Sequence, residues 1–145
     1  MSWIKSFIFG KEDCSEATES RDTTLLELAA LPMSSEIERL YHQALQDNSV
    51  AIFKLALRFY KGLGVEKNHH QAYKIFRLLW DEDADAEFYM GEICREVSIN
   101  GKPDYHQACC HYAAAMEMGN TQAKQRLRET AELSRDEFWI SWCND

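Results

Sequence analysis

The stretch that decides the fold is AIFKLALRFYKGLGVEKNHHQAYKIF, residues 51–76. An amphipathic segment is interrupted by Gly62 and Gly64 and resumes after Asn68 as a second amphipathic segment. Glycine accepts the positive φ at which helices commonly end, and asparagine accepts hydrogen bonds from the first free amides of a helix. The stretch therefore predicts a helix over about 50–61, a turn, and a second helix that begins after Asn68.

The same pattern returns further along the chain. Three matching pairs of residues are each 36 positions apart: Asn68 and Asp104, Ala72 and Ala108, and Phe76 and Tyr112. Repetition at this period is typical of helical hairpins that cannot bury their apolar faces alone and therefore stack on one another.

The pattern Ala51-xxx-Leu55-Ala56-xx-Phe59-xx-Gly62-x-Gly64-Val65-xx-Asn68-xxx-Ala72-xxx-Phe76 resembles the Sel-one-like repeat, a tetratricopeptide-related helical hairpin. A second copy follows at Ala86-xxx-Met90-Gly91 and Asp104-xxx-Ala108-xxx-Tyr112, with Cys94 in an aromatic position and a longer turn at 97–101. The resemblance covers about residues 36–128. It implies an all-α, right-handed α/α solenoid of two to three hairpins with capping helices at both ends, and a binding scaffold rather than a catalyst.

Shorter segments flank the predicted repeats. We expect short helices and a polar linker over residues 1–33, the repeat domain over 34–130, and a C-terminal capping helix over 131–145. The aromatic residues of that last segment cover the end of the stack or, alternatively, form a partner or homodimer contact. Residues 1–9 suit a short packed helix better than a membrane anchor, and no segment approaches the ~20 apolar residues of a membrane span.

The net charge of the chain indicates the class of partner, and its cysteines indicate the cellular compartment. The chain has 24 Asp and Glu against 16 Lys and Arg, a net charge of −8. This disfavours nucleic acid and anionic membranes as partners, because phosphate would repel it, and favours a basic protein. Five cysteines without a CxxC spacing favour free thiols and a cytoplasmic location.

An acidic turn is the first candidate for partner binding. Five carboxylates fall within seven residues: Asp81, Glu82, Asp83, Asp85 and Glu87. One or two of them are needed near the positive end of the next helix, where Asp83 or Asp85 can cap it. The excess suggests steering of a basic partner. The alternative is an ordinary solvated turn.

The first helices of the two hairpins are the second candidate, because such helices line the concave face of a repeat stack. Their expected non-core positions are Ile52, Phe53, Leu57, Glu87, Phe88, Glu92 and Ile93. Phe53, Leu57 and Phe88 are larger and more apolar than a solvated face requires. The alternative is that the N-terminal segments fold back and cover these side chains.

Catalytic and metal chemistry have little support in the sequence. It contains no GxSxG, HExxH or phosphate-binding glycine loop. His106 with Cys109 or Cys110 supplies two metal ligands at most, whereas a closed zinc site needs four. Some cysteine-rich members of the repeat family have been linked to β-lactam binding through cysteine pairs across the turn between units, but residues 80–87 contain no cysteine. We expect no enzymatic activity, metal or cofactor.

Within the family that the repeats resemble, some bacterial members are immunity proteins for secreted toxins and others are adaptors. For a small acidic chain of this type, we expect an immunity protein that binds a basic toxin and blocks it by occlusion. The alternative is an adaptor in a larger bacterial, membrane-associated complex. A cell-wall or β-lactam hydrolase is a third and less favoured class.

Overall fold

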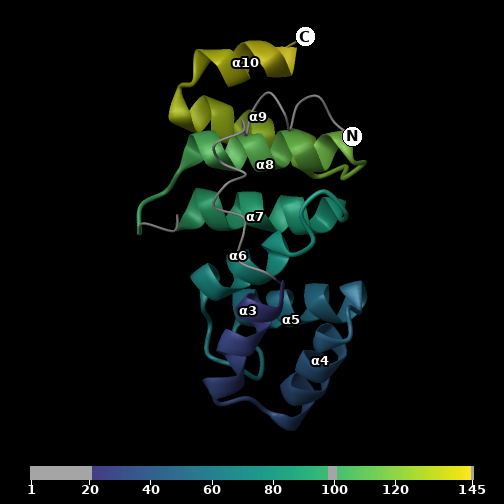
Figure 1. Cartoon of the computed structure of the whole chain (residues 1–145). Coiled ribbons are helices and arrows are strands. Elements are labelled where there is room, and N and C mark those ends of the chain that lie inside the picture. The colour runs from purple at the N-terminus through teal and green to yellow at the C-terminus, as the bar shows by residue number, and fades with distance from the viewer. Residues whose placement is uncertain (1–20, 98–100, 145) are drawn as a thin grey trace. The chain divides into compact units, whose positions relative to one another are not determined.

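The structure is a computed structural model that describes residues 21–97 and 101–144. The expectations for residues 1–9 and for Cys14 lie outside the described residues. The described secondary structure is entirely helical and confirms the all-α class. It divides into two compact units, with the boundary between Trp80 and Asp81. Figure 1 shows the helices of both units.

In the first unit, each long helix packs on the next. Its elements are α3 (Arg21–Leu26), the 3-10 helix η2 (Glu27–Ala30), α4 (Ser35–Leu45), α5 (Ser49–Lys61) and α6 (His69–Arg77). Helix α5 packs on α4 and on α6, so that α5 and α6 form the first predicted hairpin.

In the second unit too, each helix packs on the next (Figure 1). Its elements are α7 (Ala84–Glu96), α8 (Tyr105–Glu117), α9 (Ala123–Ser134) and α10 (Glu137–Asn144). Helix α8 packs on α7 and α9, and α10 packs on α9. None of the helices within 21–97 and 101–144 has the length and apolar character that crossing a bilayer requires.

Local turn chemistry explains the α5–α6 hairpin. Gly62 has φ +72° and donates its amide to the carbonyl of Arg58 at 2.8 Å, which ends α5. Asn68 Oδ1 accepts the amide of Gln71 at 3.0 Å and caps α6. Both predicted roles are confirmed.

The α7–α8 hairpin closes in the same way. Asp104 Oδ1 accepts the amide of Gln107 at 3.0 Å, so that Asp104 caps α8 as Asn68 caps α6. The Asn68 amide donates to the Phe59 carbonyl at 2.9 Å, and the Asp104 amide donates to the Cys94 carbonyl at 2.8 Å. Cys94 thus takes the place of Phe59 in backbone geometry as well as in sequence.

Serine followed three residues later by glutamate is typical of a helix start, so the sequence predicts caps at Ser35 with Glu38 and at Ser134 with Glu137. Both predictions are wrong. A capping box from Ser35 to Glu38 does not form, because α4 already begins at Ser35 and the N-cap residue, Ser34, makes no side-chain bond to the helix. Ser34 instead packs on the α5–α6 turn, where its amide donates to the Gly64 carbonyl at 3.4 Å.

The second wrong cap is at the start of α10, where Ser134 was the expected residue. Ser134 Oγ donates to the Ala131 carbonyl at 3.0 Å and belongs to the end of α9. Asp136 caps α10 instead, because its Oδ1 accepts the amides of Phe138 and Trp139 at 3.1 and 3.4 Å.

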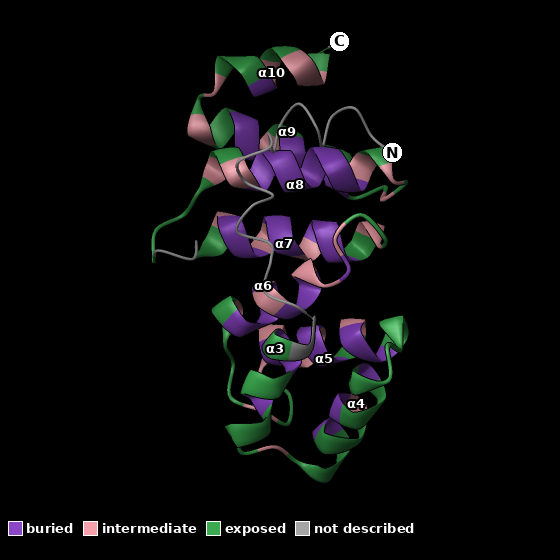
Figure 2. Cartoon of the chain, viewed as in Figure 1, coloured by how far each residue is buried: buried purple, intermediate pink, exposed green. Residues whose placement is uncertain are grey.

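The longest run of buried residues is in α8, and α10 contributes one fully buried aromatic residue. Eight consecutive residues of α8, 108–115, are buried, which requires packing on every side of the helix (Figure 2). Trp139 is the largest fully buried side chain of the described residues, while its neighbour Phe138 is 49% exposed. Trp139 therefore anchors α10, as expected of a terminal cap, and Phe138 does not. The four described cysteines are free thiols.

Candidate functional site

The acidic turn lies at the start of the second unit. Asp81, Glu82 and Asp85 are exposed, Asp83 is half-buried and Glu87 is fully buried. Asp83 Oδ1 accepts the amides of Asp85 at 2.8 Å and Ala86 at 3.1 Å, which confirms the predicted cap of α7. The cap leaves the two preceding carboxylates, Asp81 and Glu82, on the surface.

Asp85 has a structural partner within the same unit. Its Oδ1 accepts the side-chain amide of Asn120 at 2.8 Å. Asn120 Oδ1 in turn accepts the amides of Gln122 and Ala123, both at 3.0 Å, at the start of α9. Asp85 therefore connects the beginnings of α7 and α9 while remaining exposed to solvent.

Glu87 is not part of the acidic surface, and the expectation that it contacts a partner is wrong. Glu87 is 0% exposed, and its Oε2 lies 2.8 Å from Nδ1 of His111, itself 2% exposed. Gln107 Nε2 lies 3.5 Å from the other ring nitrogen of His111. Glu87 faces inward because its place on α7 points at α8, and it forms a buried polar pair there.

The expectation of non-core positions on the first helices is also wrong for three apolar residues. Ile52 and Ile93 are buried, and Phe88 is 8% exposed. Phe88 packs against Tyr112 of its own hairpin, with the ring centroids 5.8 Å apart. The spacing of small and large residues in the sequence assigns fewer positions of α7 to the core than the structure buries.

Phe53 and Leu57, on α5 in the first unit, are half-buried and keep part of their surface. The ring of Phe53 meets the ring of Phe76 edge-on at 5.6 Å. The two side chains remain candidates for partner contact within the first unit. Phe88, of the second unit, is not such a candidate, because it is buried.

Glu92 joins three helices of the second unit. Its Oε1 accepts the hydroxyl of Tyr112 at 2.5 Å and lies 3.2 Å from Nε of Arg126. Burial, followed by this hydrogen bond, raises the pKa of Tyr112. Glu92 was expected at the binding surface, and the structure uses its carboxylate to tie α7 to α8 and α9. The sequence carried no signal for this, since the three residues come from three different helices.

The net negative charge of the chain comes entirely from the residues after Trp80. Residues 81–145 contain 14 Asp and Glu and six Lys and Arg, which accounts for −8, whereas residues 1–80 contain ten of each sign. The acidic turn thus begins the segment that carries all of the excess negative charge.

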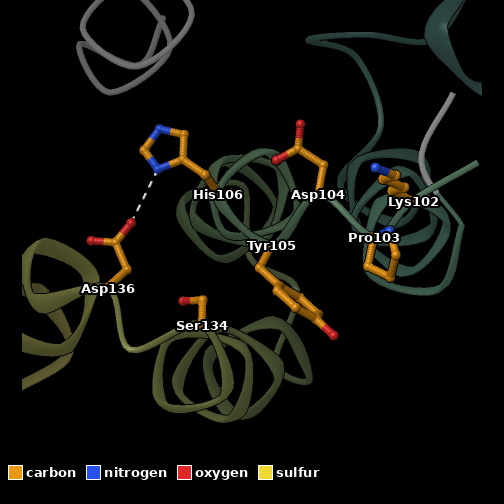
Figure 3. Close-up of a pocket in the computed structure, with 7 residues that line it drawn as sticks. All are labelled: Lys102, Pro103, Asp104, Tyr105, His106, Ser134 and Asp136. Atoms are coloured by element: carbon orange, nitrogen blue, oxygen red, sulfur yellow. Dashed lines mark hydrogen bonds and ion pairs between the residues drawn. The ribbon is translucent and has the colours of Figure 1, made fainter. Parts of the chain in front are cut away.

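An open pocket lies where α8 begins and α9 ends (Figure 3). Its lining is mixed in charge: Lys102, Pro103, Asp104, Tyr105, His106, Ser134 and Asp136. His106 Nδ1 lies 3.2 Å from Asp136 Oδ2, while the Ser134 hydroxyl donates to Ala131. The serine and the histidine therefore do not form a nucleophile–base pair. Across 21–97 and 101–144, no group of three or more His, Cys, Asp or Glu is placed to hold a metal ion.

No protein-family model matches the chain, and no curated protein or solved structure matches it. Function therefore rests on the charge, burial and geometry of the chain itself.

Proposed function

We propose that this protein is a non-catalytic binding module that recognises a basic protein through the acidic surface at the start of α7. The observation that carries the proposal is the charge distribution: the whole net charge of −8 lies in residues 81–145, and Asp81, Glu82 and Asp85 are exposed where that segment begins. A concentrated field of one sign accelerates encounter with a partner of the opposite sign.

The biological role that fits best is that of a cytoplasmic bacterial immunity protein that occludes a basic toxin. The repeat pattern that resembles Sel-one-like hairpins supports a scaffold role, and stacking of those hairpins into a right-handed solenoid is part of the proposal. Phe53 and Leu57, which keep exposed surface on α5, are the proposed apolar contacts.

An adaptor role in a larger complex is the second candidate. Exposed apolar side chains near the C-terminus favour it, since Leu133 is 56% and Phe138 49% exposed. Contacts of this kind are insensitive to salt, whereas steering by the acidic surface is not. Salt dependence of binding therefore separates the two candidates.

The test begins with recovery of the partner by the tagged native protein at low and high salt. Association rates of that partner are then measured with a variant that combines Asp81→Asn and Glu82→Gln. Asp81 has φ +73°, and asparagine tolerates this conformation. A matched control combines Glu38→Gln and Glu66→Gln, which removes two exposed charges from the first unit.

We expect the first variant to associate several-fold more slowly than the wild type at low salt and equally fast at high salt, while the control changes little. Equal association of both variants at low salt would refute steering by the acidic surface. A partner that stays bound at high salt and is lost on Phe138→Ser would favour the adaptor role.

A further inference from the structure

His106 is shared by two groups that belong to the start of α10. Its Nδ1 lies 3.2 Å from Oδ2 of Asp136 and 3.3 Å from the indole Nε1 of Trp139. His106 itself is in the first turn of α8, so that one imidazole nitrogen connects α8 to the C-terminal helix. Figure 3 shows the contact of this nitrogen with Asp136.

The two contacts require opposite states of the same nitrogen. An ionised carboxylate only accepts hydrogen bonds, so the contact with Asp136 needs a proton on Nδ1. An indole only donates, so the contact with Trp139 needs a lone pair on Nδ1. His106 can satisfy one partner at a time.

The two partners differ in their access to water. Trp139 is 0% exposed, whereas the side chains of His106 and Asp136 are 63% and 26% exposed. Water can replace His106 as a partner of Asp136, whereas the indole is buried as long as His106 lies against it. Leaving a buried donor without an acceptor costs more than an exposed ion pair contributes. The bond from Trp139 is therefore the more stabilising of the two contacts of Nδ1.

We propose that His106 is a pH-dependent latch of the C-terminal helix. Neutral His106 accepts the indole N–H of Trp139 and holds α10 against the rest of its unit. Uptake of one proton from solvent at Nδ1 turns His106 toward Asp136, removes the acceptor of Trp139 and loosens α10. Asp136 keeps its place in both states, since its Oδ1 caps α10.

Other polar groups surround His106, and the latch has to operate among them. Asp136 faces it from the turn between α9 and α10, and Trp139 faces it from α10. Around the same pocket, α8 and the loop before it contribute Lys102, Asp104 and Tyr105. Cys109, one turn further along α8, interacts with Asp136. Histidine is the only one of these side-chain types that normally changes charge between pH 5 and 8.

The experiment follows the indole N–H of Trp139 and the backbone amides of α10 by hydrogen exchange in the isotope-labelled full chain from pH 8 to pH 5. Exchange is expressed as protection relative to the intrinsic rate at each pH. We expect protection to fall about tenfold toward pH 5, the effect of a single lost hydrogen bond. The variant His106→Gln, whose side-chain carbonyl accepts at every pH, should keep its protection constant.

His70→Gln is the matched control, because His70 is exposed and lies in the first unit. It should show the same fall in protection as the wild type. An equal fall in His106→Gln, or constant protection in the wild type, would overturn the proposal.

A second variant, Asp136→Asn, keeps the cap of α10 and removes the ion pair available to protonated His106. Because the pair with Asp136 stabilises protonated His106 in the latch as proposed, this variant should lose less protection at pH 5 than the wild type. A loss as large as that of the wild type would show that Asp136 has no part in the change and would overturn the latch as stated.

Discussion

The ring of Tyr112 on α8 lies directly against the backbone of Gly91 on α7. A Cβ at Gly91 would stand 2.7 Å from Cε1 and 2.8 Å from Cδ1 of that ring, closer than real Cβ contacts occur. The Tyr112 hydroxyl donates to Glu92 Oε1 at 2.5 Å, which holds the ring at this position. The absence of a side chain at Gly91 thus sets how closely the two helices of the hairpin approach.

Replacement of this glycine tests that contact. Alanine is a better helix former than glycine by about 0.5–1 kcal/mol, but overpacking costs about 1–3 kcal/mol. We expect Gly91→Ala to lower the free energy of unfolding by about 1–2 kcal/mol, measured by denaturant titration with circular dichroism. In a Tyr112→Leu background the same change should be neutral or stabilising. A stabilised Gly91→Ala protein with Tyr112 intact would contradict the close contact.

The equivalent caps of α6 and α8 give a matched pair of predictions. Asn68→Ala and Asp104→Ala should each lower the free energy of unfolding by about 1 kcal/mol, since each leaves a helix amide without its acceptor. Asn68→Asp and Asp104→Asn preserve the acceptor and should change stability by less than about half of that. Thermal and denaturant unfolding of the four variants provide the measurement. Alanine variants as stable as the wild type would show that the caps contribute nothing.

The buried pair of Glu87 and His111 predicts a non-additive result. Glu87→Ala removes the buried contact between Glu87 and His111 and should cost about 1–3 kcal/mol of unfolding free energy. Replacing both residues with leucine should cost much less than the sum of the two single leucine variants, because no polar group is then left buried alone. A double-mutant cycle in denaturant measures the coupling. Glu82→Ala, at an exposed position, should stay within about 0.5 kcal/mol of the wild type. If the free-energy changes of the two single leucine variants add up to that of the double variant, the two side chains do not interact.

Two buried thiols predict a loss of stability at alkaline pH. Burial raises the pKa of Cys94 and of Cys109 to about 12, with smaller contributions from nearby carboxylates. The folded state therefore keeps protons that the unfolded chain releases near the ordinary thiol pKa of about 8.5. Their contribution is complete below about pH 8.5 and is lost as the pH rises toward 12.

Unfolding free energies measured between pH 8 and pH 11 provide the test of this loss. The wild type should lose more stability over this range than the variant that combines Cys94→Ala and Cys109→Ala. The other ionisable groups are the same in both proteins, so they cancel in the comparison. Parallel curves for the two proteins would rule out titration of these thiols as a cause of the loss.

The helical class and the positions of the turns could be predicted from short stretches of sequence. Gly62, Asn68 and Asp104 acted as expected, because a positive φ or a capping bond depends on residues within three or four positions. Even here the choice between neighbouring caps was decided by packing. Ser34 rather than Ser35 precedes α4, and it packs on Gly64, 30 residues away in the chain.

The sequence by itself determined which segments are helical, where the two hairpins turn, and that the excess negative charge lies after Trp80. Only the tertiary structure decided which of the charged side chains remain on the surface. Glu87 is buried against a residue 24 positions away, and Glu92 is bound by a tyrosine 20 positions away. Helical periodicity defines the face on which a side chain lies, but the neighbour of that face depends on how the helices pack.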